Sequence, residues 1–236
     1  MYCKYYGKKL DDNSTFCSEC GKPLEQINFT LDGFPGSIIS ALPINGPEDV
    51  IAVTNTGLKY LRESNYKDAY FYLREAARFG NDVAAYNTGL LLINGNGVEK
   101  NPEKGVTFLM QAAENGNAGA INNLGVCYAL GIGVEKDATR AVQWYQRGSD
   151  LGEPYAQNSL GRCYLLGDGV PKNLELGFYW TKKSADQGNI NSLFNLAVCY
   201  EKGWGVNPSK SEAIRYYKLA AEKGDKDAQK KLQTLQ

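Results

Sequence analysis

The sequence contains no histidine, and its charges cancel. Its 236 residues include 26 Lys and Arg against 26 Asp and Glu. Without histidine, the chain has no His-ligated metal centre, no His-containing nucleophile dyad and none of the commonest general bases. The charge balance gives no overall attraction to nucleic acid or to an anionic membrane.

The sequence also has no long hydrophobic run. The start MYCKYYGKKL lacks a basic segment followed by an apolar one, so no signal peptide is predicted. The longest uncharged stretch, residues 33–47, carries three prolines and is too short for a membrane-spanning helix. A content of 43% hydrophobic and 22% charged residues is ordinary for a core-forming protein. We expect a cytoplasmic location.

What the sequence does have is a repeat. Blocks of 36 residues align without gaps at 84–119, 120–155, 156–191 and 192–227; a shortened block covers 52–83, and 228–236 begins another. Each full block predicts two helices joined by a glycine loop: GNGVEKN, GIGVEKD, GDGVPKN or GWGVNPS. One such hairpin cannot bury its apolar face alone, but stacked hairpins share a continuous core. The sequence therefore predicts an all-α fold.

Residue types at the helix ends support this assignment. Residues that favour N-caps precede each expected second helix: Asn65, Asn101, Asp137, Asn173 and Ser209. A glycine follows each second helix: Gly80, Gly116, Gly152, Gly188 and Gly224. The last segment, 228–236, is expected to be a capping helix with Ala228, Leu232 and Leu235 facing the core, and Lys230, Lys231 and Gln233 facing water.

The repeated motif A-x-x-N-L-G-x-x-Y-x-x-G-x-G-V, with a W-Y or Y-Y pair and then A-A-x-x-G, resembles the Sel-1-like repeat. This family is similar to the tetratricopeptide repeat, and the resemblance covers roughly residues 50–236. It implies a right-handed α-solenoid of five hairpins plus the capping helix, spanning 51–236. It also implies a non-catalytic scaffold or adaptor that binds a partner protein or peptide. Neither a nucleic-acid nor a membrane partner is expected.

Three cysteines occupy one repeat position: Cys127, Cys163 and Cys199. Equivalent atoms of adjacent hairpins are expected about 10 Å apart, beyond the roughly 7 Å that a disulfide allows between Cα atoms. We expect these cysteines to be small core residues. Cysteine-rich members of the resembling family carry two cysteines in each repeat and a proposed penicillin-directed hydrolase activity. The single cysteine per repeat disfavours that alternative here.

The first 24 residues form a second motif. Cys17-Ser18-Glu19-Cys20-Gly21-Lys22 is a complete C-x-x-C-G-K knuckle, whereas Cys3 lacks a partner cysteine because Tyr6 occupies its position. The segment resembles the small β zinc ribbons that precede many bacterial helical domains. Structural zinc takes four ligands. Three explanations remain open. Zinc is held by Cys3, Cys17 and Cys20 plus water or a carboxylate; the segment is a metal-free relic of a zinc ribbon; or the residue at position 6 has been altered in this sequence.

That ribbon also supports an alternative function, a nucleic-acid-associated or regulatory protein. Residues 1–25 contain four lysines against four acidic residues, which is no electrostatic footprint for nucleic acid. Between ribbon and repeats, residues 25–50 carry many large apolar side chains, including Phe29, Leu31 and Phe34. We expect this connecting segment to pack on the first repeat as a cap, or to lie in the ligand groove as an autoinhibitor.

The resemblance also nominates a binding surface, because first helices line the concave face in that family. The position before the leucine of the A-x-x-N-L-G motif holds Asn55, Asn87, Asn123, Ser159 and Asn195. Beside it lie Tyr86, Asn122, Asn158 and Phe194, with Arg162 one turn later and Trp204 in the last glycine loop. An asparagine amide both donates and accepts, so it matches a peptide backbone. The alternative is that these amides bond to neighbouring backbone within the stack.

Overall fold

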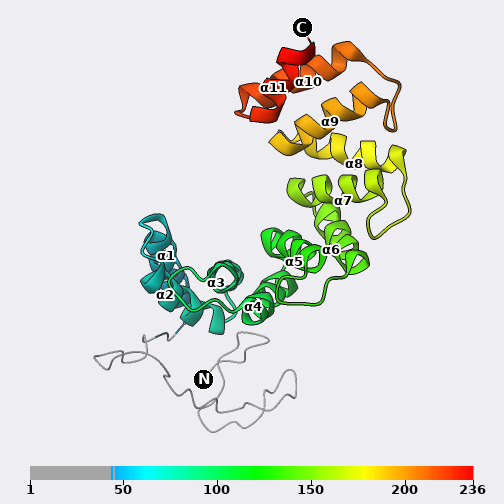
Figure 1. Ribbon diagram of the computed structural model, residues 1–236. Helices are drawn as coiled ribbons and strands as arrows, with labels where there is room; N and C mark the ends of the chain where they lie inside the picture. The colour runs from blue at the N-terminus through cyan, green and yellow to red at the C-terminus, as the bar shows by residue number, and fades with distance from the viewer. Residues whose placement is uncertain (1–43, 45, 236) are drawn as a thin grey trace. The chain divides into compact units, whose positions relative to one another are not determined.

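The computed structural model describes residue 44 and residues 46–235. These residues form eleven helices and, within the described ranges, no strand (Figure 1). None of the helices in this part of the chain is both long and apolar enough to span a bilayer. The expected ribbon at 1–24, with Cys3, Tyr6, Cys17 and Cys20, and most of the connecting segment 25–50 lie outside the described residues.

The helices divide between two compact units, Met1–Asn115 and Gly116–Gln236. In the first unit the helices are α1 (Pro47–Arg62), α2 (Tyr66–Arg78), α3 (Asp82–Asn94) and α4 (Pro102–Glu114). In the second they are α5 (Ala118–Leu130), α6 (Ala138–Asp150), α7 (Pro154–Leu166), α8 (Leu174–Asp186), α9 (Ile190–Lys202), α10 (Lys210–Glu222) and α11 (Lys226–Leu235).

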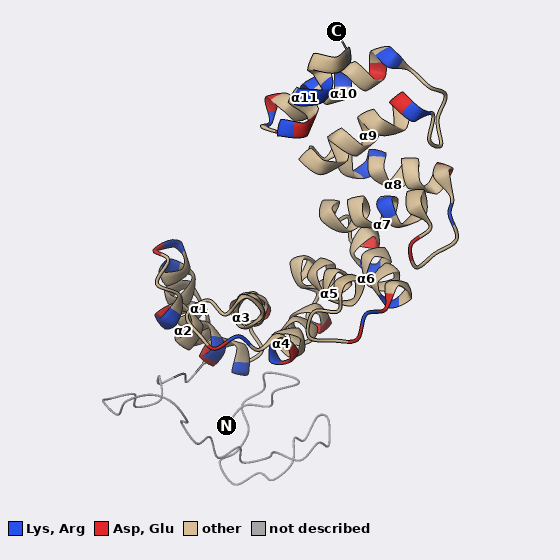
Figure 2. Ribbon diagram, in the orientation of Figure 1, with Lys and Arg blue, Asp and Glu red and all other residues tan. Residues whose placement is uncertain are grey.

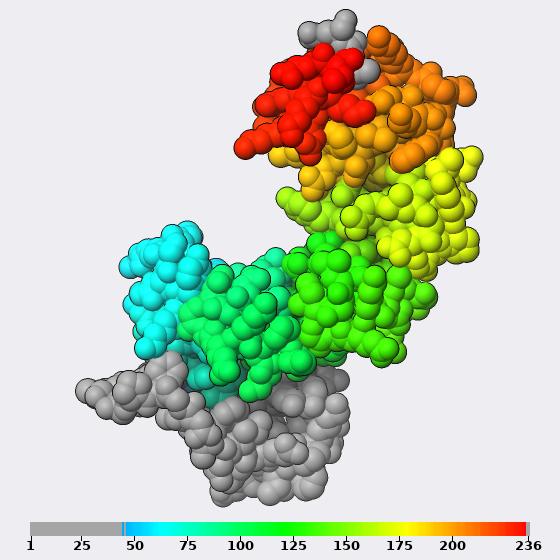
Figure 3. Space-filling view, viewed as in Figure 1, coloured from blue at the N-terminus to red at the C-terminus, as the bar shows by residue number. Residues whose placement is uncertain are grey.

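Each helix pair of the predicted repeat is a packed hairpin. In the first unit α1 packs on α2, α2 on α3 and α3 on α4. In the second unit every helix from α5 to α11 packs on the next, so consecutive hairpins lie in contact (Figure 3). Both units are therefore all-helical arrays of stacked hairpins, as the repeat predicted. The helix α1 begins at Pro47, inside the segment assigned to the connection, because Gly46 and a proline at the first helical position favour a start there.

The predicted caps of the second helices are confirmed. The side chains of Asn65, Asn101, Asp137, Asn173 and Ser209 each accept a hydrogen bond from the backbone N–H three residues later. The first helices α3, α5, α7 and α9 have caps that the sequence analysis did not predict: Asn81, Asn117, Glu153 and Asn189. Both helices of each full hairpin thus have a fixed start.

Glycine sets how closely the two helices of a hairpin approach. At Gly161, an added Cβ would lie 2.6 Å from Thr181 Oγ1 and 2.9 Å from Thr181 N, so no larger residue fits without movement. Thr181, where the other repeats have leucine or tyrosine, is fully buried against this glycine. After the first helix, Gly167 adopts φ 77°, a left-handed conformation that ends α7.

Adjacent hairpins of one unit are also joined by polar contacts that recur with the repeat. Asn115 Nδ2 donates to Gly80 O at 3.0 Å, and Gln187 Nε2 donates to Gly152 O at 3.0 Å, two repeats further on. Both acceptors are carbonyls of the glycines that follow a second helix. These bonds hold each turn against the end of the next hairpin.

The helix α11 packs on α10, with Ala228 buried and Leu232 half-buried against the core, as predicted for these two side chains. Lys230 and Gln233 are exposed, as predicted, and the Lys231 side chain is 39% exposed but also bonds to Glu201. Lys231 Nζ donates to Glu201 Oε1 at 3.2 Å and Oε2 at 3.3 Å, while Tyr217 Oη donates to Glu201 Oε2 at 2.6 Å. This network joins α9, α10 and α11.

Candidate functional site

In the second unit, the solvent-accessible side chains of the first helices follow one stripe per helix. Their spacing of three or four residues puts them on one side of each helix. We call these residues the first-helix face: Asn122, Asn123, Val126, Leu130, Tyr155, Asn158, Ser159, Arg162, Leu166, Phe194, Asn195, Val198 and Lys202. Seven of the eleven predicted binding residues belong to it.

The amides of α7 and α9 are held by a hydrogen-bond network. Asn158 Oδ1 accepts from Ser192 Oγ and from Asn195 Nδ2, both at 2.9 Å. The network fixes the orientation of the Asn158 amide, because its oxygen must face α9. Its Nδ2, with two N–H donors, has no hydrogen-bond partner among the described residues.

The two asparagines of α5 differ in their hydrogen bonds. Asn123 is half-buried, and its Nδ2 donates to Gly119 O at 3.0 Å within the same helix. Asn122 is half-buried as well, and its Oδ1 is buried without a hydrogen-bond partner. The Asn122 amide therefore has the same inward oxygen as the Asn158 amide one repeat later.

The other predicted residues of the second unit differ in exposure. Ser159 is half-buried and hydrogen-bonds to Tyr145, whose pKa is raised to about 12, chiefly because the phenol is buried. The Phe194 ring packs at an angle of 61° against Tyr217. Arg162 is exposed. Trp204 is half-buried, and its backbone N–H donates to Cys199 O, which holds the glycine loop against α9.

Three predicted residues lie in the first unit, which is described by itself. Asn55 is exposed on α1. On α3, Tyr86 and Asn87 are half-buried, and Asn87 Nδ2 donates to Val83 O at 2.8 Å. This bond to the preceding turn matches that of Asn123, so one asparagine contact recurs in both units.

Exposed apolar residues on the first-helix face are a feature that the sequence analysis missed. Leu130, Leu166 and Tyr155 are 66%, 61% and 59% exposed, whereas large apolar side chains of a helical repeat are normally in the core. Leu130 and Leu166 are the last residues of α5 and α7, seven residues after Asn123 and Ser159. That helical spacing from the predicted positions could have identified them.

Charge is scarce on these two helices. Helix α5 contains no acidic or basic residue, and Arg162 is the single charged residue of α7 (Figure 2). No acidic side chain within salt-bridge distance of Arg162 is found in the described part of the chain. The face around α5 and α7 therefore combines amide groups, three exposed apolar side chains and one cation.

The three described cysteines are core residues, as predicted. Cys127, Cys163 and Cys199 are free and buried, and burial raises the pKa of the thiols to about 11, 11 and 12 respectively. At neutral pH the reactive thiolate form is therefore scarce. Within the described ranges, no group of His, Cys, Asp or Glu side chains is arranged to hold a metal ion.

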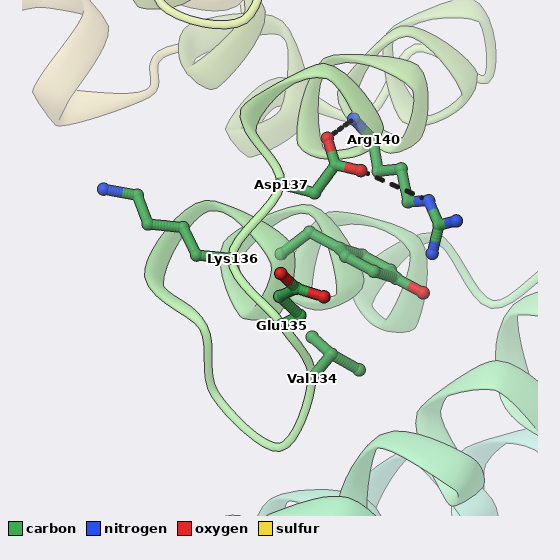
Figure 4. Close-up of a pocket in the computed structure, with 6 residues that line it drawn as sticks. Val134, Glu135, Lys136, Asp137 and Arg140 are labelled. Carbon is green, nitrogen blue, oxygen red and sulfur yellow. Dashed lines mark hydrogen bonds and ion pairs between the residues drawn. The ribbon is translucent and has the colours of Figure 1, made fainter.

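A surface hollow of about 330 Å³ lies at the glycine loop before α6 (Figure 4). Its lining is of mixed charge: Tyr128, Val134, Glu135, Lys136, Asp137 and Arg140. Asp137 caps α6 by accepting from the Arg140 N–H at 2.9 Å, and its second oxygen pairs with Arg140 Nε at 3.3 Å. A neighbouring hollow of about 300 Å³ is lined by Tyr128, Arg140, Gln143, Trp144 and Arg147. Neither hollow includes a predicted binding residue.

Comparisons with known proteins agree with this architecture. No curated protein matches the chain. A Sel1 repeat protein from Oxalobacter formigenes superimposes with a TM-score of 0.75 at 29% identity over 81% of each chain. A protective antigen of uropathogenic Escherichia coli with an SLR fold gives 0.72 at 30% identity; the match covers 78% of this chain and 40% of the antigen.

An immunity protein from Pseudomonas aeruginosa shares the fold, with a TM-score of 0.54 at 20% identity over 73% of this chain and 68% of that protein. The sequence profile of the Sel1 repeat matches five times, at residues 54–81, 82–117, 118–153, 154–189 and 190–225. The chain therefore belongs to the Sel1 repeat family.

Proposed function

We propose that this protein is a non-catalytic scaffold or adaptor, and that the first-helix face binds a partner protein or peptide in a groove. The supporting observation is the composition of α5 and α7: exposed Leu130, Leu166 and Tyr155 beside asparagine amides, with Arg162 as the one charge. Apolar side chains at this exposure favour burial by a partner, and amides match backbone groups.

A role without catalysis is supported by the chemistry of the described side chains. The sequence has no histidine. The cysteines of the repeats are buried with raised pKa values, which makes them poor nucleophiles. Five Sel1 repeats also favour protein interaction over turnover. We propose a cytoplasmic location, which fractionation of the native cells would test.

Photo-crosslinking tests the proposed surface. A photoreactive amino acid is placed at position 130 or 166 on the first-helix face, and at Thr139 or Glu175, which are exposed on the second helices α6 and α8. In native cytosol we expect one defined protein adduct from 130 and 166, and none from 139 and 175. Adducts from 139 and 175 alone would move the binding surface to the second helices.

A double substitution provides a second test. Asn123→Ala with Asn195→Ala removes two amides of the first-helix face, and we expect recovery of the crosslinked partner to fall by about tenfold. Thermal unfolding of the variant is the control, because Asn195 also bonds to Asn158. Equal recovery from a folded variant would show that these amides do not bind the partner.

The N-terminal motif remains a separate proposal. We propose that Cys3, Cys17 and Cys20 hold zinc with water or a carboxylate as the fourth ligand. The test is metal analysis of protein purified without added zinc. Stoichiometric zinc that is lost in Cys17→Ser supports the site, and zinc-free protein of unchanged stability supports the relic explanation.

The competing roles of residues 25–50 as cap or autoinhibitor are tested by deleting residues 1–46. Lower stability of the shortened protein supports the cap, and tighter partner binding supports autoinhibition.

A further inference from the structure

We infer that the ligand of the first-helix face is an extended segment in the polyproline II conformation, with aliphatic side chains at positions i and i+3 and an acidic residue next to them. This inference rests on the proposed function and names the partner that the face fits. It is carried by three features of α5 and α7: their spacing, the orientation of two amides and the single cation.

The first feature is spacing. Leu130 and Leu166 are equivalent residues of adjacent hairpins, on helices that contact one another. We expect the two leucine side chains to be separated by about 8–10 Å, the usual spacing of packed helices. A polyproline II chain has three residues per turn and rises about 3.1 Å per residue, so residues i and i+3 point the same way about 9 Å apart. In a β-strand the residues on one side, i and i+2, are only about 7 Å apart.

The second feature is the orientation of the amides. Asn122 and Asn158 are also 36 residues apart, and each turns its Oδ1 inward. Their Nδ2 groups therefore present hydrogen-bond donors to the solvent side with the same one-repeat spacing. A polyproline II chain makes no internal hydrogen bonds, so its carbonyls are available at every third residue. A helical ligand with aliphatic residues at i and i+7 also spans about 10 Å, but its backbone is already bonded.

The third feature is charge. Arg162 is exposed on α7, one helical turn before Leu166, and no acidic group of α5 or α7 faces it. A carboxylate on the ligand would complete this ion pair. Proline-rich segments pre-order the polyproline II conformation and lower the entropy lost on binding.

Fluorescence titration with synthetic peptides tests the inference on the full chain. The main probe is proline-rich, with leucines at i and i+3 and glutamate between them. Two comparison probes carry the leucines at i and i+2, or at i and i+7 of a helical peptide. We expect the main probe to bind at least about tenfold more tightly than either. Tighter binding of the helical probe would overturn the inference, and so would failure of the main probe to bind.

Substitutions locate the probe. Leu166→Lys should weaken binding of the main probe by about tenfold or more, whereas Leu151→Lys should not. Leu151 is 59% exposed, close to the 61% of Leu166, but it lies before the opposite end of α7. Equal loss in both variants would overturn the inference.

A charge exchange provides the sharpest readout. The Arg162→Glu protein should no longer bind the glutamate probe and should bind a probe with lysine at the same position. Absence of that exchange would overturn the role of Arg162.

Crosslinking of a natural partner from position 166 does not depend on these peptides. If crosslinks form while the main probe fails, the extended register is wrong and the proposed function stands; if both fail, the surface itself is wrong.

Discussion

Two neighbouring junctions of the second unit have the same backbone arrangement but different chemistry. Where α8 meets α9, Ser192 Oγ lies 2.6 Å from Ser184 Oγ and 2.9 Å from Asn158 Oδ1, within hydrogen-bond distance of both. One repeat earlier the equivalent positions are Ala156, Gly148 and Asn122. An added Cβ on Gly148 would lie only 2.6 Å from the Ala156 Cβ, and Asn122 Oδ1 has no partner. One junction is held by hydrogen bonds and the other by close packing of small residues.

The comparison shows that a repeat position specifies spacing rather than residue type. Both junctions leave the equivalent Leu160 and Leu196 fully buried, so the common core does not depend on which contact is used. The polar junction also sets the direction of the Asn158 amide, whereas the packed junction leaves a buried oxygen unsatisfied. Such an oxygen costs stability.

The largest expected effect tests whether the core is common to both junctions. Leu160→Ala and Leu196→Ala each create a cavity at a fully buried position. We expect each to lower the free energy of unfolding by about 2–5 kcal/mol. Urea unfolding followed by circular dichroism measures both. If the losses in free energy of unfolding of the two variants differ by more than about 2 kcal/mol, the junctions do not share an equivalent core.

A methyl group should disrupt the packed junction. In Gly148→Ala the new Cβ meets the Ala156 Cβ at 2.6 Å and Ile121 Cγ2 at 3.3 Å. We expect a loss of about 1–3 kcal/mol from overpacking, despite the higher helix propensity of alanine. Ser184→Ala at the equivalent position adds no Cβ, so any loss there comes from its hydrogen bonds with Pro154 O and Ser192 Oγ and not from overpacking. A Gly148→Ala protein as stable as the unsubstituted chain would refute close packing at this junction.

Removing the serine of the polar junction should have a smaller effect. Ser192→Ala leaves Asn158 Oδ1 with one donor, Asn195 Nδ2, instead of two. We expect a loss of about 0.5–1.5 kcal/mol, measured in the same unfolding assay. An unchanged stability would mean that the Ser192 hydroxyl does not hold the junction.

The reverse substitution should stabilise the packed junction. Ala156→Ser places a hydroxyl where Ser192 stands one repeat later, next to the unpartnered Asn122 Oδ1. A new hydrogen bond to a buried oxygen should add about 0.5–1 kcal/mol to the free energy of unfolding. A loss of stability would show that the two junctions are too different in shape to exchange residues.

The last hairpin extends the comparison, because Lys231 occupies the position of Ser159 and Asn195 and bonds to Glu201. The pKa of Glu201 is lowered chiefly by the hydrogen bond from Tyr217 and further by the hydrogen bond from Lys231. Partial burial of the carboxylate acts in the opposite direction. A lowered pKa in the folded state gives stability that is present above the unfolded-state pKa and is lost as pH falls through the folded-state value.

We therefore expect Glu201→Gln to lower stability at neutral pH by less than about 1 kcal/mol. Below the lowered pKa of Glu201 the substitution should have little effect. The measurement is thermal unfolding across acidic pH. A difference between the two proteins that persists unchanged in acid would show that the Glu201 charge is not what joins α11 to α9.

Local signals allowed much of the fold to be predicted. The glycines after helices α2 to α10, the asparagine, aspartate and serine caps and the buried cysteines all follow from residue type and repeat position. The caps Asn81, Asn117 and Asn189 carried the same signal and were missed. The bond from Lys231 to Glu201 was not predicted, because the two residues are 30 apart in sequence.

The candidate site was less predictable. Repeat position placed the asparagines on the accessible side of the first helices, but the direction of an amide depends on its neighbours. Asn158 is oriented by Ser192 and Asn195 of the next hairpin, whereas Asn123 bonds within its own helix. Leu130 and Leu166 were missed because an apolar residue at a helix end is ordinarily assigned to the core.

Methyl NMR of leucine-labelled protein, titrated with the partner recovered by crosslinking, tests the first-helix face most directly. The account predicts that the methyl resonances of Leu130 and Leu166 shift or broaden on binding, while those of Leu176, exposed on α8, do not. Movement of the Leu176 resonances with those of Leu130 and Leu166 unchanged would contradict it.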